Sequence, residues 1–200
     1  MKEDNVITKF SNNVFEHMAL QSNLMHACKV YMEKRAMEIT LLALASECLE
    51  AISYILDRTK PWKAHEIDEK HVKEEVIDIY HFYLQMLVLS GLYHNTFSRG
   101  IMKFSEPSDS MLTLESACKI SAARAIDLSY YYTNNTIDAL KNNNEHDLAT
   151  FATLQWYRML TMFGVLKLSP EEVDTLYRQK NEKNLMRIKE KMSSGNSQST

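Results

Sequence analysis

Glycine and proline are scarce in this sequence, whose 200 residues include only 4 Gly and 3 Pro. Collagen-like and low-complexity chains need far more of both residues. Hydrophobic residues make up 45% of the sequence, and the formal net charge is −3. A disordered chain would have a lower hydrophobic fraction and a larger net charge. The composition therefore predicts one ordinary folded domain over residues 1–192, followed by a disordered tail over residues 193–200.

Cysteine is also scarce, and long apolar runs are missing. Cys28, Cys48 and Cys118 are odd in number and lack the paired spacing of a disulfide framework or a zinc site. We therefore expect buried, reduced thiols and a cytoplasmic protein. No run approaches the ~18 apolar residues that a membrane-spanning helix needs. The N-terminal segment is polar, so we expect neither an export signal nor a membrane partner.

Charge of one sign does not dominate the sequence, which has 23 Lys and Arg residues against 26 Asp and Glu residues. A protein that coats nucleic acid needs a dominant basic face. We therefore expect no nucleic-acid partner. Any anionic ligand must instead meet a local basic patch.

The few breakers leave long stretches that can be helical. Apolar residues such as Leu41, Ala45, Cys48 and Ile52 recur at helical spacing, and no segment shows the clean alternation of a strand. We predict an all-α helical bundle of about five to seven helices. The expected helices cover residues 13–32, 70–90, 112–140, 146–167 and 170–191, with a further helix that starts near 41 and ends at 58–61, and with loops at 95–110 and 141–144.

Four acidic residues stand out because their surroundings are almost entirely apolar. Glu47 and Glu50 are the only charged residues between 41 and 56, and Asp78, with Glu75 one turn before it, is the only one from 76 to 98. Each pair lies on one helix face. Buried carboxylates are costly without compensation, and no nearby Lys or Arg on these helices supplies it. A metal site between two central helices is the economical explanation, and oxygen ligands favour Mg²⁺ or Mn²⁺; surface acids paired in an oligomer are the alternative.

A basic patch follows near the C-terminus. Lys180, Asn184 and Arg187 fall at i, i+4 and i+7 on one helix face, with Asn181 alongside. Arg offers a fork of donors and Lys a point charge for phosphate oxygens, while Asn adds neutral donors. The pattern favours a phosphate-binding helix; the alternative is a solvated, charged helix.

Together these segments resemble the ExxE…ExxD signature of the all-α nucleotide pyrophosphohydrolases, the superfamily of MazG-like enzymes and dimeric dUTPases. Glu47–Glu50 and Glu75–Asp78 carry that signature. The Pro61–Lys63 segment resembles the Trp-Lys that follows the first metal helix, and Ile77–Phe82 resembles the Asp-Ile-aromatic-His-Phe segment. Tyr177–Arg187 is similar to the YxxKNxxNxxR motif. The details are most similar to the dimeric dUTPase and phage-type dCTPase-dUTPase branch.

The sequence departs from the family's motifs at two places. Residues 20–25 follow the family's LQxxLN pattern, but Met25 replaces the Asn that helps to read the base. The RQxxGY ending of the branch is absent after Arg187. Both uracil and cytosine are therefore kept as candidate bases of the nucleotide substrate.

The resemblance implies a single nucleotide pyrophosphohydrolase domain, forming a homodimer, that hydrolyses dUTP, dCTP or both to the monophosphate and pyrophosphate with Mg²⁺, or with Mn²⁺. Glu47, Glu50, Glu75 and Asp78 would be the metal ligands and catalytic residues, and Glu47 could accept the proton of the attacking water. The residues implied to bind the substrate are Gln21, Trp62, Lys63, His81, Phe82, Tyr177, Lys180, Asn181, Asn184 and Arg187.

Three other functions are compatible with parts of the pattern. One is a broad MazG-like activity on several nucleoside triphosphates, and another is a non-catalytic helical module that binds a nucleotide or a protein partner. The third is a carboxylate-bridged di-iron bundle, because Asp78 and His81 have acid-x-x-His spacing. That architecture needs Glu-x-x-His on two helices, which this chain lacks.

Overall fold

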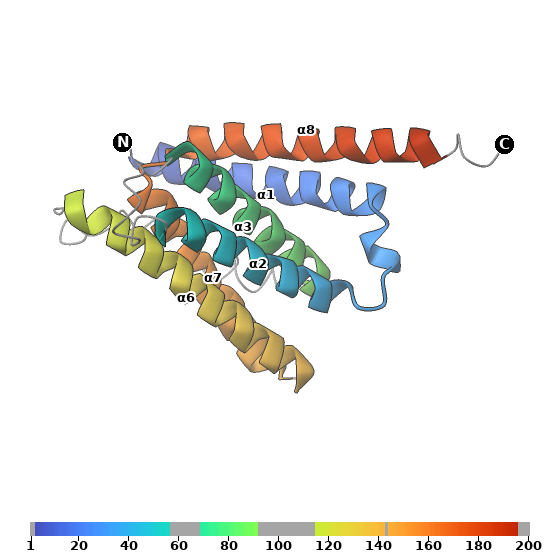
Figure 1. Ribbon diagram of the computed structural model, residues 1–200, viewed down its shortest axis with the longest axis horizontal. Coiled ribbons are helices and arrows are strands. Elements are labelled where there is room, and N and C mark those ends of the chain that lie inside the picture. Colours follow the sequence, from blue (N-terminus) through green and yellow to red (C-terminus); the bar gives the residue numbers. More distant parts are fainter. Residues whose placement is uncertain (1–2, 57–68, 92–114, 143, 196–200) are drawn as a thin grey trace.

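The computed structural model describes residues 3–56, 69–91, 115–142 and 144–195. Within these ranges the chain forms α-helices and one 3-10 helix and has no strand, which confirms the predicted all-α bundle (Figure 1). None of the described helices is long and apolar enough to cross a membrane. The elements are α1 (Glu3–Ala27), η1 (Val30–Met32), α2 (Ala36–Leu56), α3 (Glu69–Ser90), α6 (Glu115–Lys141), α7 (Glu145–Val165) and α8 (Pro170–Gly195).

Several helix boundaries differ from the sequence-based expectation: α1 begins at Glu3 and not at 13, and α2 begins at Ala36 and not near 41. The first expected helix ends at Ala27, and Lys29 adopts a left-handed backbone (φ 57°) before η1 begins. At the other end of the chain α8 continues through Gly195, so Ser193 and Ser194 are helical and not part of a tail. Residues 196–200 and the expected loop at 95–110 lie outside the described residues.

A capping box starts α8 at the expected position. The backbone N–H of Glu172 donates to Ser169 Oγ over 3.2 Å, and the Glu172 carboxylate accepts from the backbone N–H of Ser169 over 2.8 Å. Pro170 fits the first turn because that turn needs no N–H donor. These contacts fix where α8 begins, and therefore which of its residues face the bundle.

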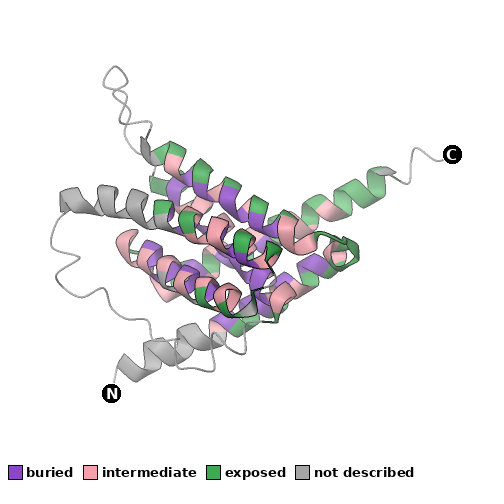
Figure 2. Ribbon diagram, turned by 90° about the horizontal axis from the view of Figure 1, so that it is seen from below, coloured by how far each residue is buried: buried purple, intermediate pink, exposed green. Residues whose placement is uncertain are grey.

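The helix α3 lies at the centre of the described bundle. It packs against α1, α2, α7 and α8, while α6 packs against α2 and α7, and α1 lies beside α8 (Figure 1). The inward faces of these helices are buried (Figure 2). Large side chains fill the space between α3 and its neighbours, including Tyr80, Tyr83, Trp156, Phe163 and Tyr177. The acidic residues of α3 are therefore held on a helix that packs against four others.

The cysteines are partly as expected. Cys48 and Cys28 are both free thiols, and Cys48 is buried. Cys28 is exposed, because it follows the last turn of α1 and not a core helix, so the expectation of burial is wrong for this residue. The side chain of Cys118 lies outside the described part of the structure.

Candidate active site

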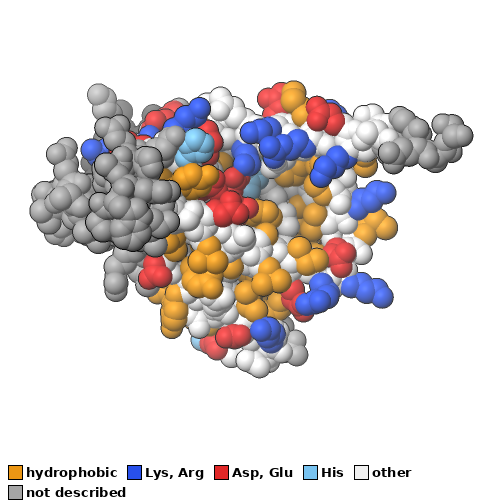
Figure 3. All heavy atoms as spheres, in the orientation of Figure 1, with side chains coloured by type: hydrophobic (Ala, Val, Ile, Leu, Met, Phe, Trp, Pro, Cys, Tyr) orange, Lys and Arg blue, Asp and Glu red, His pale blue; other side chains and the backbone are white. Residues whose placement is uncertain are grey.

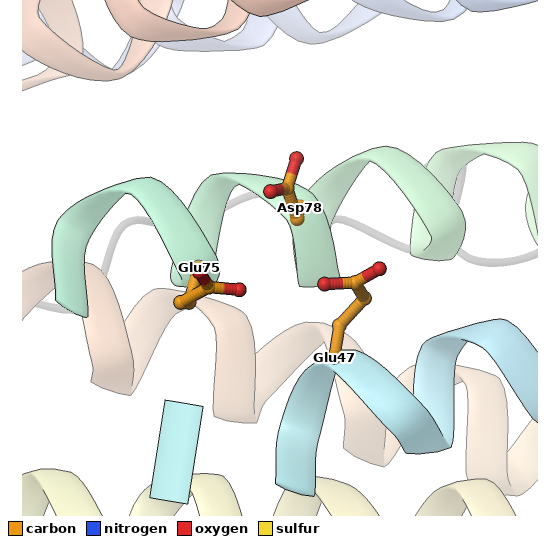
Figure 4. A group of neighbouring side chains, drawn as sticks. All are labelled: Glu47, Glu75 and Asp78. Carbon is orange, nitrogen blue, oxygen red and sulfur yellow. The ribbon is translucent and has the colours of Figure 1, made fainter. Parts of the chain in front are cut away.

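Three carboxylates from two adjacent helices form a compact cluster. Glu47 comes from α2, and Glu75 and Asp78 come from one face of α3 (Figure 4). Each offers one carboxylate oxygen, and these three oxygens all lie within 4.8 Å of one another. All three side chains are partly buried. The pairing of the two acidic helices predicted from the sequence is therefore present in the fold.

The carboxylates raise one another's affinity for protons. Burial, followed by the charges of Asp78, Glu50 and Glu75, raises the pKa of Glu47 to about 7. Burial and the charge of Asp78 also raise the pKa of Glu75. A cation placed among these oxygens would reverse both effects. An all-oxygen set of partly buried, mutually repelling carboxylates fits a hard divalent cation such as Mg²⁺ or Mn²⁺.

Lys180 of α8 supplies part of the missing positive charge. Its Nζ donates to Asp78 Oδ2 over 2.5 Å. Burial raises the pKa of Asp78, and the hydrogen bond from Lys180 opposes that increase. A single lysine cannot neutralise the three clustered carboxylates, and the exposed Glu50 adds its negative charge from outside the cluster.

A cavity of about 440 Å³ is lined by Glu47 and Asp78 together with basic residues of α8, whereas Glu75 does not line it. Acidic and basic side chains lie next to each other on this face of the molecule (Figure 3). The cavity therefore combines groups suited to a cation with groups suited to phosphate. Its lining residues are Gln21, Leu24, Met25, Cys28, Val30, Glu47, Asp78, His81, Phe82, Gln85, Lys180, Asn184, Arg187 and Ile188.

Not all of the predicted substrate-binding residues line this cavity. Tyr177 is fully buried, and its hydroxyl shares its single proton between the carbonyl of His17 and Gln21 Oε1, each over 3.0 Å. Asn181 is also buried and donates to the carbonyl of Leu20 over 3.4 Å. Both residues hold α8 against α1. Trp62 and Lys63 lie outside the described residues.

His81 is held as a neutral side chain. Its Nδ1 lies 2.8 Å from Gln21 Oε1, and its ring stacks on Tyr177 with the ring centroids 4.2 Å apart. Burial, together with the charge of Lys180, lowers the pKa of His81 to about 3. At neutral pH this imidazole therefore offers one N–H donor and one nitrogen lone pair.

The cavity also contains residues that the sequence analysis missed. Gln85 lies four residues after His81 and seven after Asp78, so all three share one face of α3, and helical spacing could have identified it. Cys28 and Val30 come from the segment between α1 and α2, Cys28 from a turn and Val30 from the start of η1. No sequence spacing places a turn against a cavity, because the path of the turn depends on packing.

A helical bundle with carboxylates from adjacent helices beside a basic helix is an arrangement that suits a phosphate compound bound together with a divalent cation. A family model described as dUTPase matches residues 13–192, and the chain belongs to this family. The family resemblance read from the motifs is therefore confirmed, and it places the protein among the nucleotide pyrophosphohydrolases. Among curated proteins and among solved structures, no significant match is found.

Proposed function

We propose that the protein hydrolyses dUTP, dCTP or both to the monophosphate and pyrophosphate in a Mg²⁺-dependent reaction. The observation that carries this proposal is that Glu47 and Asp78 share one cavity with Lys180, Asn184 and Arg187. Carboxylates alone would suit many cation sites, and a basic helix alone would suit many anions. A cavity with both is what a triphosphate bound with its cation requires.

Glu47, Glu75 and Asp78 would hold the metal ion, with Glu50 close enough to add its charge. Bound there, Mg²⁺ would neutralise phosphate charge and orient the attacking water. Mn²⁺ has the same preference for oxygen ligands and could replace it. The donor chemistry of the cluster therefore fits the cofactor.

The chain's own residues would divide the remaining work. Lys180 reaches both Asp78 and the cavity, so its ammonium can exchange the carboxylate for a phosphate oxygen. Asn184 and Arg187 would bind further phosphate oxygens from the next turns of α8. The pKa of Glu47, raised to about 7 by burial and its acidic neighbours, suits a group that accepts a proton from water near neutral pH.

The base would occupy the part of the cavity formed by α1 and α3. Gln21, His81 and Gln85 offer hydrogen-bonding groups there, and Phe82, Leu24 and Met25 offer apolar contacts. This mixture is typical of sites that bury a flat, polar-edged ring. Tyr177 would act indirectly, through its hydrogen bond to Gln21.

The deciding experiment is pyrophosphate release from dUTP, dCTP, dTTP and UTP, measured with Mg²⁺ and again with EDTA. We expect release from dUTP, dCTP or both only when Mg²⁺ is present. Comparable release from all four nucleotides would indicate a broad MazG-like enzyme. Binding of a nucleotide without any release would indicate a non-catalytic module and would overturn the proposal.

We further propose that the protein is a homodimer that uses the outer face of α2. Ile39, Leu42 and Leu49 are each at least half exposed on this helix. Their spacing of three and seven residues places them along one stripe. An apolar stripe of this kind is typical of a subunit interface.

A further inference from the structure

A chain of hydrogen bonds runs from α2 to the cavity. Gln85 Nε2 donates to Thr40 Oγ1 over 2.7 Å, and Gln21 Nε2 donates to Gln85 Oε1 over 3.1 Å. Gln21 Oε1 in turn lies 2.8 Å from His81 Nδ1. Thr40, Gln21 and His81 are all buried, so water cannot readily replace these bonds. Four side chains from α1, α2 and α3 are thus joined in one sequence of donors and acceptors.

The direction of the whole chain is set at its α2 end. Thr40 Oγ1 lies 2.7 Å from the carbonyl oxygen of Ala36. A carbonyl oxygen can only accept, so the Thr40 hydroxyl must donate to it and can then only accept from Gln85. Gln85 must therefore turn its Nε2 toward Thr40 and its Oε1 toward Gln21. The amide of Gln21 is oriented in the same way by Gln85.

The same logic fixes the groups at the cavity end. Gln21 Oε1 accepts from His81 Nδ1 and, over 3.0 Å, from Tyr177 Oη, whose single proton is shared with the carbonyl of His17, so both lone pairs of Gln21 Oε1 face donors. Gln21 can offer a ligand only its second N–H. His81 must carry its proton on Nδ1, because it donates to Gln21. His81 Nε2 is then a bare acceptor, and no other group in the described part of the protein bonds to it.

We infer that Thr40 is a positioning residue for base selection: it sets which hydrogen-bonding groups Gln21, Gln85 and His81 offer to the base, although it does not line the cavity. The reversed chain would place Gln85 Oε1 against Thr40 Oγ1, where Thr40 could donate only by giving up its bond to Ala36. Thr40 therefore disfavours the reversed chain by one buried hydrogen bond. This inference rests on the proposed function.

The direction of the hydrogen-bond chain matters because the two candidate bases present their donors and acceptors in opposite order. Uracil carries a donor at N3 and an acceptor at O4, whereas cytosine carries an acceptor at N3 and a donor at N4. Gln21 and His81 exchange donors for acceptors when the chain reverses. A pocket that suits one base in the first arrangement suits it less well in the second.

The first test is the ratio of kcat/KM for dUTP to that for dCTP in Thr40→Val. Valine keeps the shape of threonine but removes its hydroxyl, so the reversed chain is no longer disfavoured. We expect the ratio to change by about fivefold or more, as loss of one discriminating hydrogen bond predicts. Thr40→Ser retains the hydroxyl and should retain the wild-type ratio. An unchanged ratio in an active Thr40→Val enzyme would overturn the inference.

Thr136→Val is the matched control for loss of a buried threonine. Thr136 is 1% exposed in α6, and its Oγ1 donates to the carbonyl of Tyr132 over 2.7 Å, the same kind of bond that Thr40 makes to Ala36. It does not line the cavity. We expect Thr136→Val to lose stability without changing the base ratio. An equal change of ratio in both variants would mean that general loosening, and not Thr40, causes it.

The second test does not need activity. The ¹⁵N chemical shifts of His81, assigned by comparison with His81→Gln, report its tautomer in the metal-free and substrate-free protein. We expect the proton on Nδ1 in the wild type and a mixture of tautomers in Thr40→Val. A wild-type proton on Nε2 would overturn the inference even if the enzyme is active. If no nucleotide is hydrolysed, the proposed function fails, while the tautomer still decides the direction of the chain.

Discussion

At the scale of single residues, the electrostatics of the site depend on Glu47. Burial and three acidic neighbours raise the pKa of its carboxylate to about 7. The positive charge of Lys180 opposes this increase, but by less than any of the acidic neighbours adds to it. The same features that make this carboxylate unfavourable in the metal-free protein make it a strong ligand and a capable base. Loss of its charge should therefore affect function far more than folding.

Glu47→Gln and Asp78→Asn should each lower the rate of pyrophosphate release by about 100-fold or more. Both carboxylates would supply negative charge to the metal ion, and Glu47 would also accept the proton of the attacking water. Helicity by circular dichroism should be unchanged in both variants, and the metal-free thermal stability of Glu47→Gln should not fall, since repulsion among the carboxylates is removed. Glu38→Gln is a matched control: Glu38 lies in the first turn of α2 and pairs with Arg35. Retained activity in both site variants would exclude the metal assignment.

The contribution of Glu47 to the stability of the metal-free protein should fall as the pH rises from about 4.5 through about 7. The pKa of Glu47 is raised from 4.5 to about 7 by burial and acidic neighbours, so at this group the folded state binds more protons than the unfolded state in this window, whereas burial of His81 lowers its pKa to about 3 and acts in the opposite direction. Stability falls with pH wherever the folded state binds more protons. Thermal unfolding in EDTA between pH 5 and 8 measures this trend.

Two comparisons make that pH prediction specific. Adding Mg²⁺ should weaken or reverse the trend, because a bound cation stabilises the charged carboxylates. The difference in stability between the wild type and Glu47→Gln in EDTA should shift against the wild type as the pH rises across this window, because only the wild type carries the raised pKa of Glu47. A difference that does not change with pH would contradict the assignment of a raised pKa to Glu47.

At the scale of elements, α8 joins the phosphate-binding face to the rest of the bundle. Its buried side, through Tyr177 and Asn181, packs on α1, and its partly exposed side presents Lys180, Asn184 and Arg187 to the cavity. The capping box at Ser169 and Glu172 sets the start of the helix. The register of α8 thus determines which residues can reach a triphosphate.

Arg187→Ala should raise KM for the nucleotide by about tenfold or more and leave kcat less affected, because the lost interaction is a hydrogen-bonded charge on bound phosphate. Lys189→Ala is the control on the same helix, since Lys189 is exposed and does not line the cavity. Steady-state kinetics with the preferred nucleotide provides the measurement. Unchanged KM in Arg187→Ala would show that α8 does not contact the phosphates.

The sequence predicts elements better than contacts between them. Helix positions follow from breakers, caps and periodicity, which are local, so α3 and α8 start within a residue of their expected positions. The pair formed by Lys180 and Asp78 joins residues 102 positions apart and depends on how α8 docks on α3. The burial of Tyr177 and Asn181, which turns predicted ligand contacts into helix-packing contacts, is likewise decided by docking.

At the scale of the whole molecule, buried and exposed apolar residues are divided unevenly between the faces of the bundle. The α3 helix is enclosed by four other helices, whereas one side of α2 has no partner in the described part of the chain. Hydrophobic side chains gather on the face where α2 and α6 lie (Figure 3). Leu42 and Leu49 are 59% and 50% exposed there, which is unusual for leucines on a helix of such high apolar content.

Leu42→Glu should convert a dimer into a monomer, because a charge would have to be buried at the centre of the proposed interface. Sedimentation equilibrium should give twice the 23.2 kDa of one chain for the wild type and a single chain for the variant. Met192→Glu is the matched control, since Met192 is 51% exposed near the end of α8. A dimer that survives Leu42→Glu but is lost in Met192→Glu would place the interface on α8. A monomeric wild type would contradict the dimer itself, and the exposed stripe of α2 would then be a surface without a partner copy.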